Sequence, residues 1–213
     1  GKDKRKMLGR PLFCWILTEA VLSKLDKVYV TTNDKWIVTF IATHFSWTDK
    51  IQVISRSKSS EDGHLDDIAL EFFENTNDTF DSLSILLATN PFTKAKDINH
   101  CLEAIVDGNS SATTVTTSQG HTWTAEGESL SSTSCFQMEN RAVYTISKAA
   151  LSSGKPLVSN DTATIEMNNI SQVLLSSDTA WKNVEHALAI QLISSKKAQK
   201  IKYLVLDVDG VFT

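Results

Sequence analysis

Hydrophobic residues along the chain alternate between short runs typical of buried strands and longer patterns with helical spacing. The strand signals are rich in β-branched and aromatic residues and fall at 27–32 (KVYVTT), 83–89 (LSILLAT), 112–117 (ATTVTT), 142–146 (AVYTI) and 203–208 (YLVLDV). Helical patterns lie between them, at 11–25, 34–45, 65–74, 95–106 and 179–196. This alternation predicts an α/β fold with a mostly parallel sheet and helices on both faces.

Several positions mark where the predicted elements begin and end. Pro11 suits the first turn of a helix, and Asn33 and Asp178 suit the caps of two others. The small polar residues of 120–134 (GHTWTAEGESLSSTS) predict a loop or a hairpin. Ligands of such folds bind beyond the carboxyl ends of strands. We therefore expect a site among the residues that follow Thr32, Ala88, Thr117 and Ser176.

Composition narrows the classes of function. The 213 residues suffice for one large domain or two small ones, with 41% hydrophobic and 22% charged residues. A net charge of −4 gives no reason to expect nucleic acid as the main partner. The longest apolar run, 11–17, is too short to span a membrane. The three cysteines and five histidines show no metal-ligand spacing, and the odd number of cysteines does not indicate a disulfide framework.

Two features point to different compartments. Asn77, Asn109, Asn160 and Asn169 each begin an N-x-[S/T] sequon, which would suit a secretory location such as the Golgi lumen. The basic cluster at 2–6 (KDKRK) suits either a nuclear signal or a solvated loop.

Three polar segments follow predicted strands, and each has a structural and a functional interpretation. The segment 31–34 (TTND) is either a helix cap or a phosphate or sugar contact at a helix N-terminus. The segment 88–92 (ATNPF) is either a turn or part of a ligand site. The segment 55–62 (SRSKSSED) is either a polar loop or a phosphate-binding set containing Arg56.

The order of these segments is more specific than any one of them. The chain contains KDKRKMLGRPLF, VYVTTND, VISR, SSED, LLATNPF and MENRAVY, in that order. It resembles the CMP-sialic acid synthetases (CMP-N-acylneuraminate cytidylyltransferases), whose patterns are K-N-x-x-x-x-x-G-x-P-L-[IL], V-x-V-S-T-D, a strand ending in Arg, S-x-D, Q-x-T-S-P and E-N-G-x-x-Y. The resemblance runs from Lys2 to about Ile190.

The resemblance implies a Rossmann-like nucleotidyltransferase fold and a Mg²⁺-dependent transfer of CMP from CTP to N-acylneuraminate, giving CMP-sialic acid and pyrophosphate. It also implies a homodimer or homotetramer, and for vertebrate members a nuclear location. Residues 1–198 would form a cytidylyltransferase-like domain whose A-R-G-G-S-K-G triphosphate loop lies before Gly1. Residues 199–213, with Asp207-Val208-Asp209-Gly210, resemble the first strand of a haloacid-dehalogenase-like module, and phosphatase activity of this chain is not expected.

Matching the motifs residue by residue gives candidate site residues but no catalytic assignment. Nucleotide or substrate contacts are implied for Lys2, Asp3, Arg56, Ser60, Leu87, Thr89, Asn90, Glu139 and Asn140. Asp178 matches the first carboxylate of the family's D-I-D-W metal segment and is either a Mg²⁺ ligand or a helix cap.

Several positions depart from the family pattern. Asp3 stands for Asn, Leu87 for Gln, Arg141 for Gly and Ala180 for the second metal carboxylate. The segment 129–137 (SLSSTSCFQ) stands where the family has R-x-R-R, which includes its catalytic Arg. These departures support a second hypothesis, a pseudoenzyme that keeps the fold and acts as a binding or partner subunit.

Overall fold

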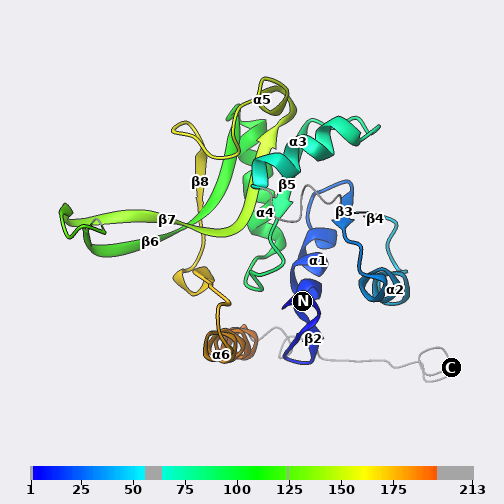
Figure 1. Cartoon of the computed structure of the whole chain (residues 1–213), viewed down its shortest axis with the longest axis horizontal. Helices are drawn as coiled ribbons and strands as arrows, with labels where there is room; N and C mark the ends of the chain where they lie inside the picture. The colour runs from blue at the N-terminus through cyan, green and yellow to red at the C-terminus, as the bar shows by residue number, and fades with distance from the viewer. Residues whose placement is uncertain (1, 56–63, 124, 196–213) are drawn as a thin grey trace. The chain divides into compact units, whose positions relative to one another are not determined.

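The computed structural model describes residues 2–55, 64–123 and 125–195, without the side chains of 121–123 and 129–134. The chain divides into two compact units, residues 1–174 and 175–213. Figure 1 draws both units. The last helix belongs to the second unit, and the domain boundary predicted after residue 198 stays a prediction.

The helices match the predicted patterns closely. They are α1 (Leu12–Leu22), α2 (Lys35–His44), α3 (Leu65–Asn75), α4 (Ala95–Val106), the short α5 (Lys148–Ser152) and α6 (Asp178–Ser194), with 3₁₀ turns η1 (Lys2–Lys4) and η2 (Asn169–Ser171). The five predicted helices are confirmed, and α4 has the predicted bounds. In α6, Trp181 and Leu188 are buried, whereas Leu192 is exposed.

Two of the predicted helix caps are wrong by one residue. The carboxylate of Asp34, not the side chain of Asn33, accepts a hydrogen bond from the Trp36 amide at the start of α2. The hydroxyl of Ser177, not the side chain of Asp178, accepts from the Ala180 amide at the start of α6. The misplacement reflects how often adjacent residues in such segments are both able to cap.

The described strands form three sheets. β1 (Lys6–Met7) and β2 (Arg10–Pro11) form a small hairpin, and β3 (Val28–Thr31) pairs in parallel with β4 (Ile51–Ile54). The largest sheet has the order β5-β7-β6-β8, formed by β5 (Ser82–Leu86), β7 (Ser129–Ser147), β6 (Ser111–Trp123) and β8 (Ala163–Glu166).

The largest sheet is mixed rather than mostly parallel. β7 runs antiparallel to both β5 and β6, whereas β8 runs parallel to β6. The reversal follows from the 120–134 segment, which forms the predicted hairpin and sends β7 back along β6 as a long ribbon (Figure 1). The α/β fold itself is confirmed.

Helices cover both faces of this sheet, as predicted. On one face α1 and α4 bury Phe13, Leu17, Ile98 and Cys101 against Val143 of β7. On the other face α3 and α5 bury Ala69 and Leu151 against Tyr144 and Ile146. Neighbouring residues of β7 thus pack into hydrophobic cores on opposite faces of the sheet, because successive side chains of a strand point to opposite faces.

A wide bulge interrupts the ribbon near the end of β5. Thr113 pairs with Tyr144 and Val115 with Glu139, so residues 140–143 of β7 face Thr114 alone. Arg141 lies in this bulge with a φ of 54°, in the left-handed region.

Some predictions fall outside these elements. The predicted strand at 203–208 and the Asp207–Gly210 motif lie outside the described residues. Within the described part of the chain, no helix is long and apolar enough to cross a membrane.

Candidate functional site

The carboxyl end of β5 brings together site residues that were predicted from two separate motifs. Leu87, Thr89 and Asn90 follow β5, and the Leu87 amide donates to the Ala142 carbonyl in the bulge of β7 at 3.1 Å. Glu139 and Asn140 lie at the other end of that bulge. The two motifs are far apart in sequence, so their meeting here is a product of the β5–β7 pairing.

Asn90 is buried and holds its loop in place. Its side chain is 1% exposed, and Nδ2 donates to the carbonyls of Asn140 at 3.1 Å and Ser171 at 2.9 Å. Its Oδ1 accepts from the Phe92 amide at 3.3 Å. These contacts leave the Asn90 amide inside the protein, while its neighbour Thr89 is exposed. The side chain therefore serves to position the loop.

Asn140 is the second buried amide of this network. It is 1% exposed, and its Oδ1 accepts from the Thr114 hydroxyl at 2.7 Å. Its Nδ2 donates to the Ser171 hydroxyl at 2.9 Å and approaches the Met167 sulfur at 3.1 Å. We call Asn90, Thr114, Asn140 and Ser171 the buried amide network. Thr114 and Ser171 were not predicted, because an isolated Thr or Ser carries no signal in sequence.

The residues on either side of Asn140 are exposed. Glu139 accepts a hydrogen bond from the hydroxyl of Tyr144, which itself is buried. Burial, helped by this contact with Glu139, raises the pKa of Tyr144, and the nearby guanidinium of Arg141 acts in the opposite direction. Thr89, Glu139 and Arg141 thus present polar groups to solvent around the buried amide network.

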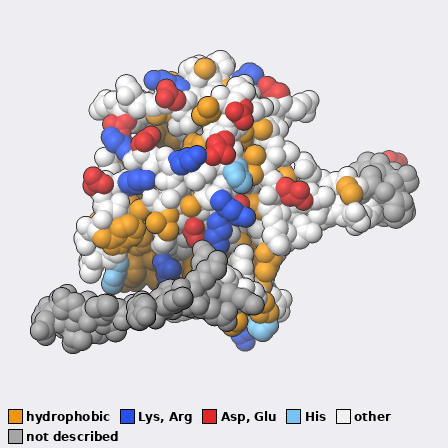
Figure 2. All heavy atoms as spheres, turned by 180° about the vertical axis from the view of Figure 1, so that it is seen from behind, with side chains coloured by type: hydrophobic (Ala, Val, Ile, Leu, Met, Phe, Trp, Pro, Cys, Tyr) orange, Lys and Arg blue, Asp and Glu red, His pale blue; other side chains and the backbone are white. Residues whose placement is uncertain are grey.

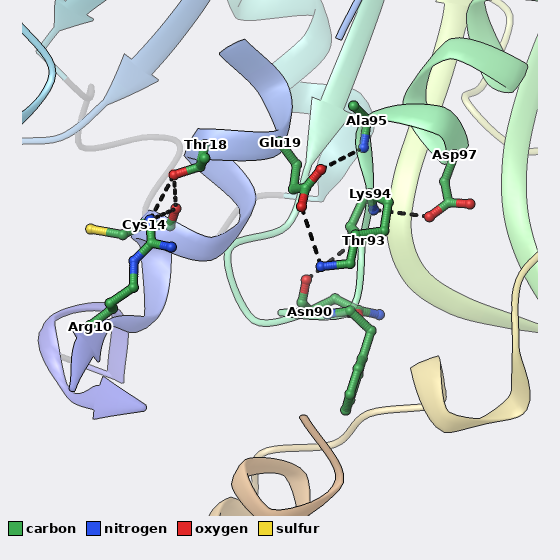
Figure 3. A network of polar contacts seen from close by, with 10 residues as sticks. Arg10, Cys14, Thr18, Glu19, Asn90, Thr93, Lys94, Ala95 and Asp97 are labelled. Carbon is green, nitrogen blue, oxygen red and sulfur yellow. Dashed lines mark hydrogen bonds and ion pairs between the residues drawn. The ribbon is translucent and has the colours of Figure 1, made fainter. Parts of the chain in front are cut away.

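The loop after β5 is also fixed from the side of α1 (Figure 3). Glu19 accepts from the Ala95 amide at 2.9 Å and from the ammonium group of Lys94 at 3.2 Å. Asp97 accepts from the Lys94 amide at 2.9 Å, and burial raises the pKa of its carboxyl group. Both ends of the loop are therefore held, one by the buried amide network and one by α1.

A second group of predicted residues lies at the N-terminal end of the chain. Lys2 is exposed and Asp3 half-buried, and both belong to η1. The next residue, Lys4, forms an ion pair with Asp34, 2.5 Å between Nζ and Oδ2, and this contact lowers the pKa of Asp34. Asp34 follows β3, so the pair ties η1 to the carboxyl end of that strand. This supports the cap interpretation of the 31–34 segment.

The metal prediction receives little geometric support. Asp178 is the first residue of α6, and residues 172–176 before it form no strand, contrary to our expectation. Among the described residues, no group of three or more His, Cys, Asp or Glu side chains could hold a metal ion. Arg56 and Ser60 lie outside the described residues.

A hollow lies elsewhere in the first unit. It has a volume of about 530 Å³ and is lined by Arg10, Cys14, Phe40, His44 and Trp47, among others. Figure 2 shows hydrophobic side chains gathered toward the lower left of one face, whereas charged side chains of both signs are interspersed above them. Of the predicted site residues that the structure describes, none lines this hollow.

Comparison with known proteins decides the family. The sequence matches the cytidylyltransferase family over residues 1–204, nearly its whole length. The chain belongs to the cytidylyltransferase family. This confirms the predicted enzyme class, although a search of curated proteins found no match.

Solved structures of other cytidylyltransferases share the fold. A 4-diphosphocytidyl-2C-methyl-D-erythritol synthase from Anaerococcus prevotii is similar with a TM-score of 0.66 and 12% identity, over 89% of this chain and 92% of the other. A CMP:2-keto-3-deoxy-manno-octonic acid synthetase complexed with CTP has a TM-score of 0.63 and 13% identity, over 90% and 92% of the two chains. At such low identity these similarities establish the fold alone.

Proposed function

We propose that this cytidylyltransferase transfers CMP from CTP to N-acylneuraminate, releasing pyrophosphate. Three observations support the proposal: the family match, the ordered motifs from Lys2 to Tyr144, and a similar structure whose name describes a CMP transfer to another sugar acid. The resemblance to the CMP-sialic acid synthetases is the reason for choosing sialic acid as the acceptor.

The meeting of two motifs at the carboxyl end of β5 carries this proposal. Ligands of α/β folds bind at such strand ends. Here the segment 87–90 and the segment 139–141 meet around one buried amide network, with Thr89, Glu139 and Arg141 exposed beside it. A rigid support under exposed polar groups is what positioning of two substrates requires.

The chemistry asks the protein mainly to position reactants and neutralise charge. A hydroxyl of the acceptor attacks the α-phosphorus of CTP and releases its proton to solvent, the bond from that phosphorus to the α–β bridging oxygen breaks, and pyrophosphate leaves. The hydroxyl of Thr89 would donate a hydrogen bond to the nucleotide. The buried amide network would hold the loop that carries Thr89 in place.

We include Mg²⁺ in the proposal, although no group of three or more His, Cys, Asp or Glu side chains among the described residues could hold a metal ion. Mg²⁺ commonly binds through one or two carboxylates together with substrate phosphates. Asp178 could supply one such carboxylate, and the nucleotide would have to supply the rest. Asp178→Asn should keep the start of α6, because Ser177 caps it, and should weaken Mg²⁺-dependent CTP binding. Unchanged binding by that variant would remove Asp178 from the proposed site.

Pyrophosphate release upon mixing CTP, Mg²⁺ and N-acetylneuraminate tests the function directly. Release that depends on all three reagents is expected. The same assay with 2-keto-3-deoxy-manno-octonic acid in place of sialic acid tests the acceptor. Turnover with that sugar acid alone would keep the CMP transfer and reject the sialic acid.

A binding subunit without turnover is the second candidate. Leu87 favours it, because its half-buried side chain packs against the apolar cluster that contains Tyr144 and Ile146, at the position where related enzymes have Gln. Saturable binding of CTP by calorimetry with no pyrophosphate release would support this candidate. Turnover would exclude it.

The assembly and compartment are proposals as well. We propose a homodimer or homotetramer, which light scattering would test. A nuclear protein and a Golgi protein differ in N-glycosylation, so a mobility shift after glycosidase treatment would favour the Golgi lumen.

A further inference from the structure

Arg141 is isolated among basic residues in the sequence. It is the sole Lys or Arg between Lys96 and Lys148, a stretch that contains all of β6 and β7. Any guanidinium or ammonium group that this stretch offers to a ligand must therefore come from Arg141. Its position within the stretch is equally specific, since it lies in the bulge opposite Thr114.

The backbone at Arg141 is in a conformation that favours glycine. Its φ of 54° lies in the left-handed region, which costs an L-residue about 1–2 kcal/mol. The related enzymes have Gly in the same E-N-G motif, so the bulge does not need an arginine. An arginine in a strained position that glycine occupies in related enzymes is an indication of function.

Arg141 lies among the residues of the candidate site. Arg141 itself is exposed, and the next residue, Ala142, accepts a hydrogen bond from Leu87 at the end of β5. The preceding residue, Asn140, belongs to the buried amide network. The guanidinium lies beside the Tyr144 hydroxyl, and no carboxylate among the described residues forms a salt bridge with it.

We propose that Arg141 binds an oxyanion of the substrates at the carboxyl end of β5. A guanidinium group binds phosphate and carboxylate through paired hydrogen bonds, so the anion is either a phosphate of the nucleotide or the carboxylate of the sugar acid. The inference deepens the proposed function and rests on it. It also supplies a positive charge in a chain whose 129–137 segment has none.

Arg141→Gly tests the proposal, because the variant should be more stable than the wild-type protein but should bind the anion more weakly. Glycine relieves the positive φ, so the melting temperature should rise by about 1–4 °C. Loss of the guanidinium should weaken binding of the anion about tenfold to a hundredfold. Calorimetric titration with CTP and, separately, with N-acetylneuraminate identifies which of the two anions is bound.

Two further variants serve as controls. Arg141→Lys keeps the charge and the strained backbone but loses the paired donors, so its melting temperature should be unchanged and its affinity intermediate. Lys148→Gln removes one positive charge at the next basic residue along the chain and should leave both affinities unchanged. Equal weakening by Lys148→Gln would show that only net charge matters and would overturn the proposal.

The outcomes separate this inference from the proposed function. If Arg141→Gly binds both CTP and N-acetylneuraminate as tightly as the wild-type protein does, the role of Arg141 is overturned and the proposed function is left intact. If the wild-type protein binds neither CTP nor N-acetylneuraminate, the proposed function is wrong. Inorganic pyrophosphate then tests the anion site by itself, and equal pyrophosphate affinity of wild type and Arg141→Gly would overturn the inference as well.

Discussion

At the scale of single residues, burial changes the role of two predicted contacts. The motifs predicted Asn90 and Asn140 as ligand contacts, and both lie in the right region, at the carboxyl end of β5. Their side chains are nevertheless turned inward and bonded to the protein. A sequence motif identifies a residue that a site needs but cannot tell whether the residue contacts the ligand or supports those that do.

Asn140→Ala should destabilise the protein strongly. The change removes the donor to Ser171 and leaves the Thr114 hydroxyl without one of its partners, so we expect the free energy of unfolding to fall by about 2–4 kcal/mol. Urea unfolding measures the loss. Gln137→Ala, at an exposed position of the same strand, should change it by less than about 0.5 kcal/mol. Equal effects of the two variants would contradict the role of the network.

The cysteines should differ sharply in reactivity. Burial raises the pKa of Cys14 to about 11 and that of Cys101 to about 12, whereas Cys135 is exposed. At pH 8 a thiol reagent such as dithionitrobenzoate should therefore modify one thiol in the native protein and three after unfolding. Fast modification of all three in the native protein would be inconsistent with these burials.

The same pKa values predict how stability changes in alkali. The unfolded thiols ionise near their ordinary pKa of 9.0, before the buried thiols do. The contribution of the two buried thiols to the free energy of unfolding is therefore complete below pH 9. It is lost as the pH rises through about 11 for Cys14 and about 12 for Cys101. Cys14→Ser and Cys101→Ser should each reduce this alkaline decline in unfolding measurements.

At the scale of elements, the sequence predicted the helices better than the sheet. Hydrophobic spacing fixed α1 to α4 and α6, because a helix is defined by its own local pattern. The direction of β7 and the bulge opposite Thr114 depend on pairing with distant strands, which spacing along one strand does not encode. The candidate site was therefore predicted only in part, since Arg141 lies in that bulge.

Thr114 holds the bulge together through its hydroxyl. It donates to Asn140 Oδ1 at 2.7 Å and accepts from the Val143 amide at 3.1 Å. Thr114→Val keeps the shape but removes both bonds, so the free energy of unfolding should fall by about 2–3 kcal/mol. Thr114→Ser keeps the hydroxyl and should lose less. A valine variant as stable as the serine variant would show that the hydroxyl contributes nothing.

At the scale of the first unit, helices connect strands that do not pair. The described strands β3 and β4 form a sheet separate from β5-β7-β6-β8, yet α1 and α4 pack both sheets into one hydrophobic core. Glu19 of α1 strengthens this connection by accepting from the first amide of α4. α4 needs this contact, because the side chain of Lys94 before it offers no hydrogen-bond acceptor.

Glu19→Ala should weaken the connection between α1 and α4. The change leaves the Ala95 amide and the Lys94 ammonium group without their acceptor, so the free energy of unfolding should fall by about 1–2 kcal/mol. Glu19→Gln keeps a carbonyl oxygen for the amide and should cost less than Glu19→Ala in the same urea unfolding experiment. If glutamine is as damaging as alanine, the ion pair rather than the cap is the main contribution.

The β6–β7 ribbon has a consequence for how the protein folds. Its two strands are joined by a short turn, so their pairing closes only a small loop and can form on a microsecond timescale. Pairing of β5 with β7 joins Ser82 to Ser147 and must close a much longer loop. The hydrogen bond from Asn90 to Asn140 in the buried amide network depends on that second step. The candidate site should therefore be among the last parts of the first unit to become ordered, after the ribbon that supports it.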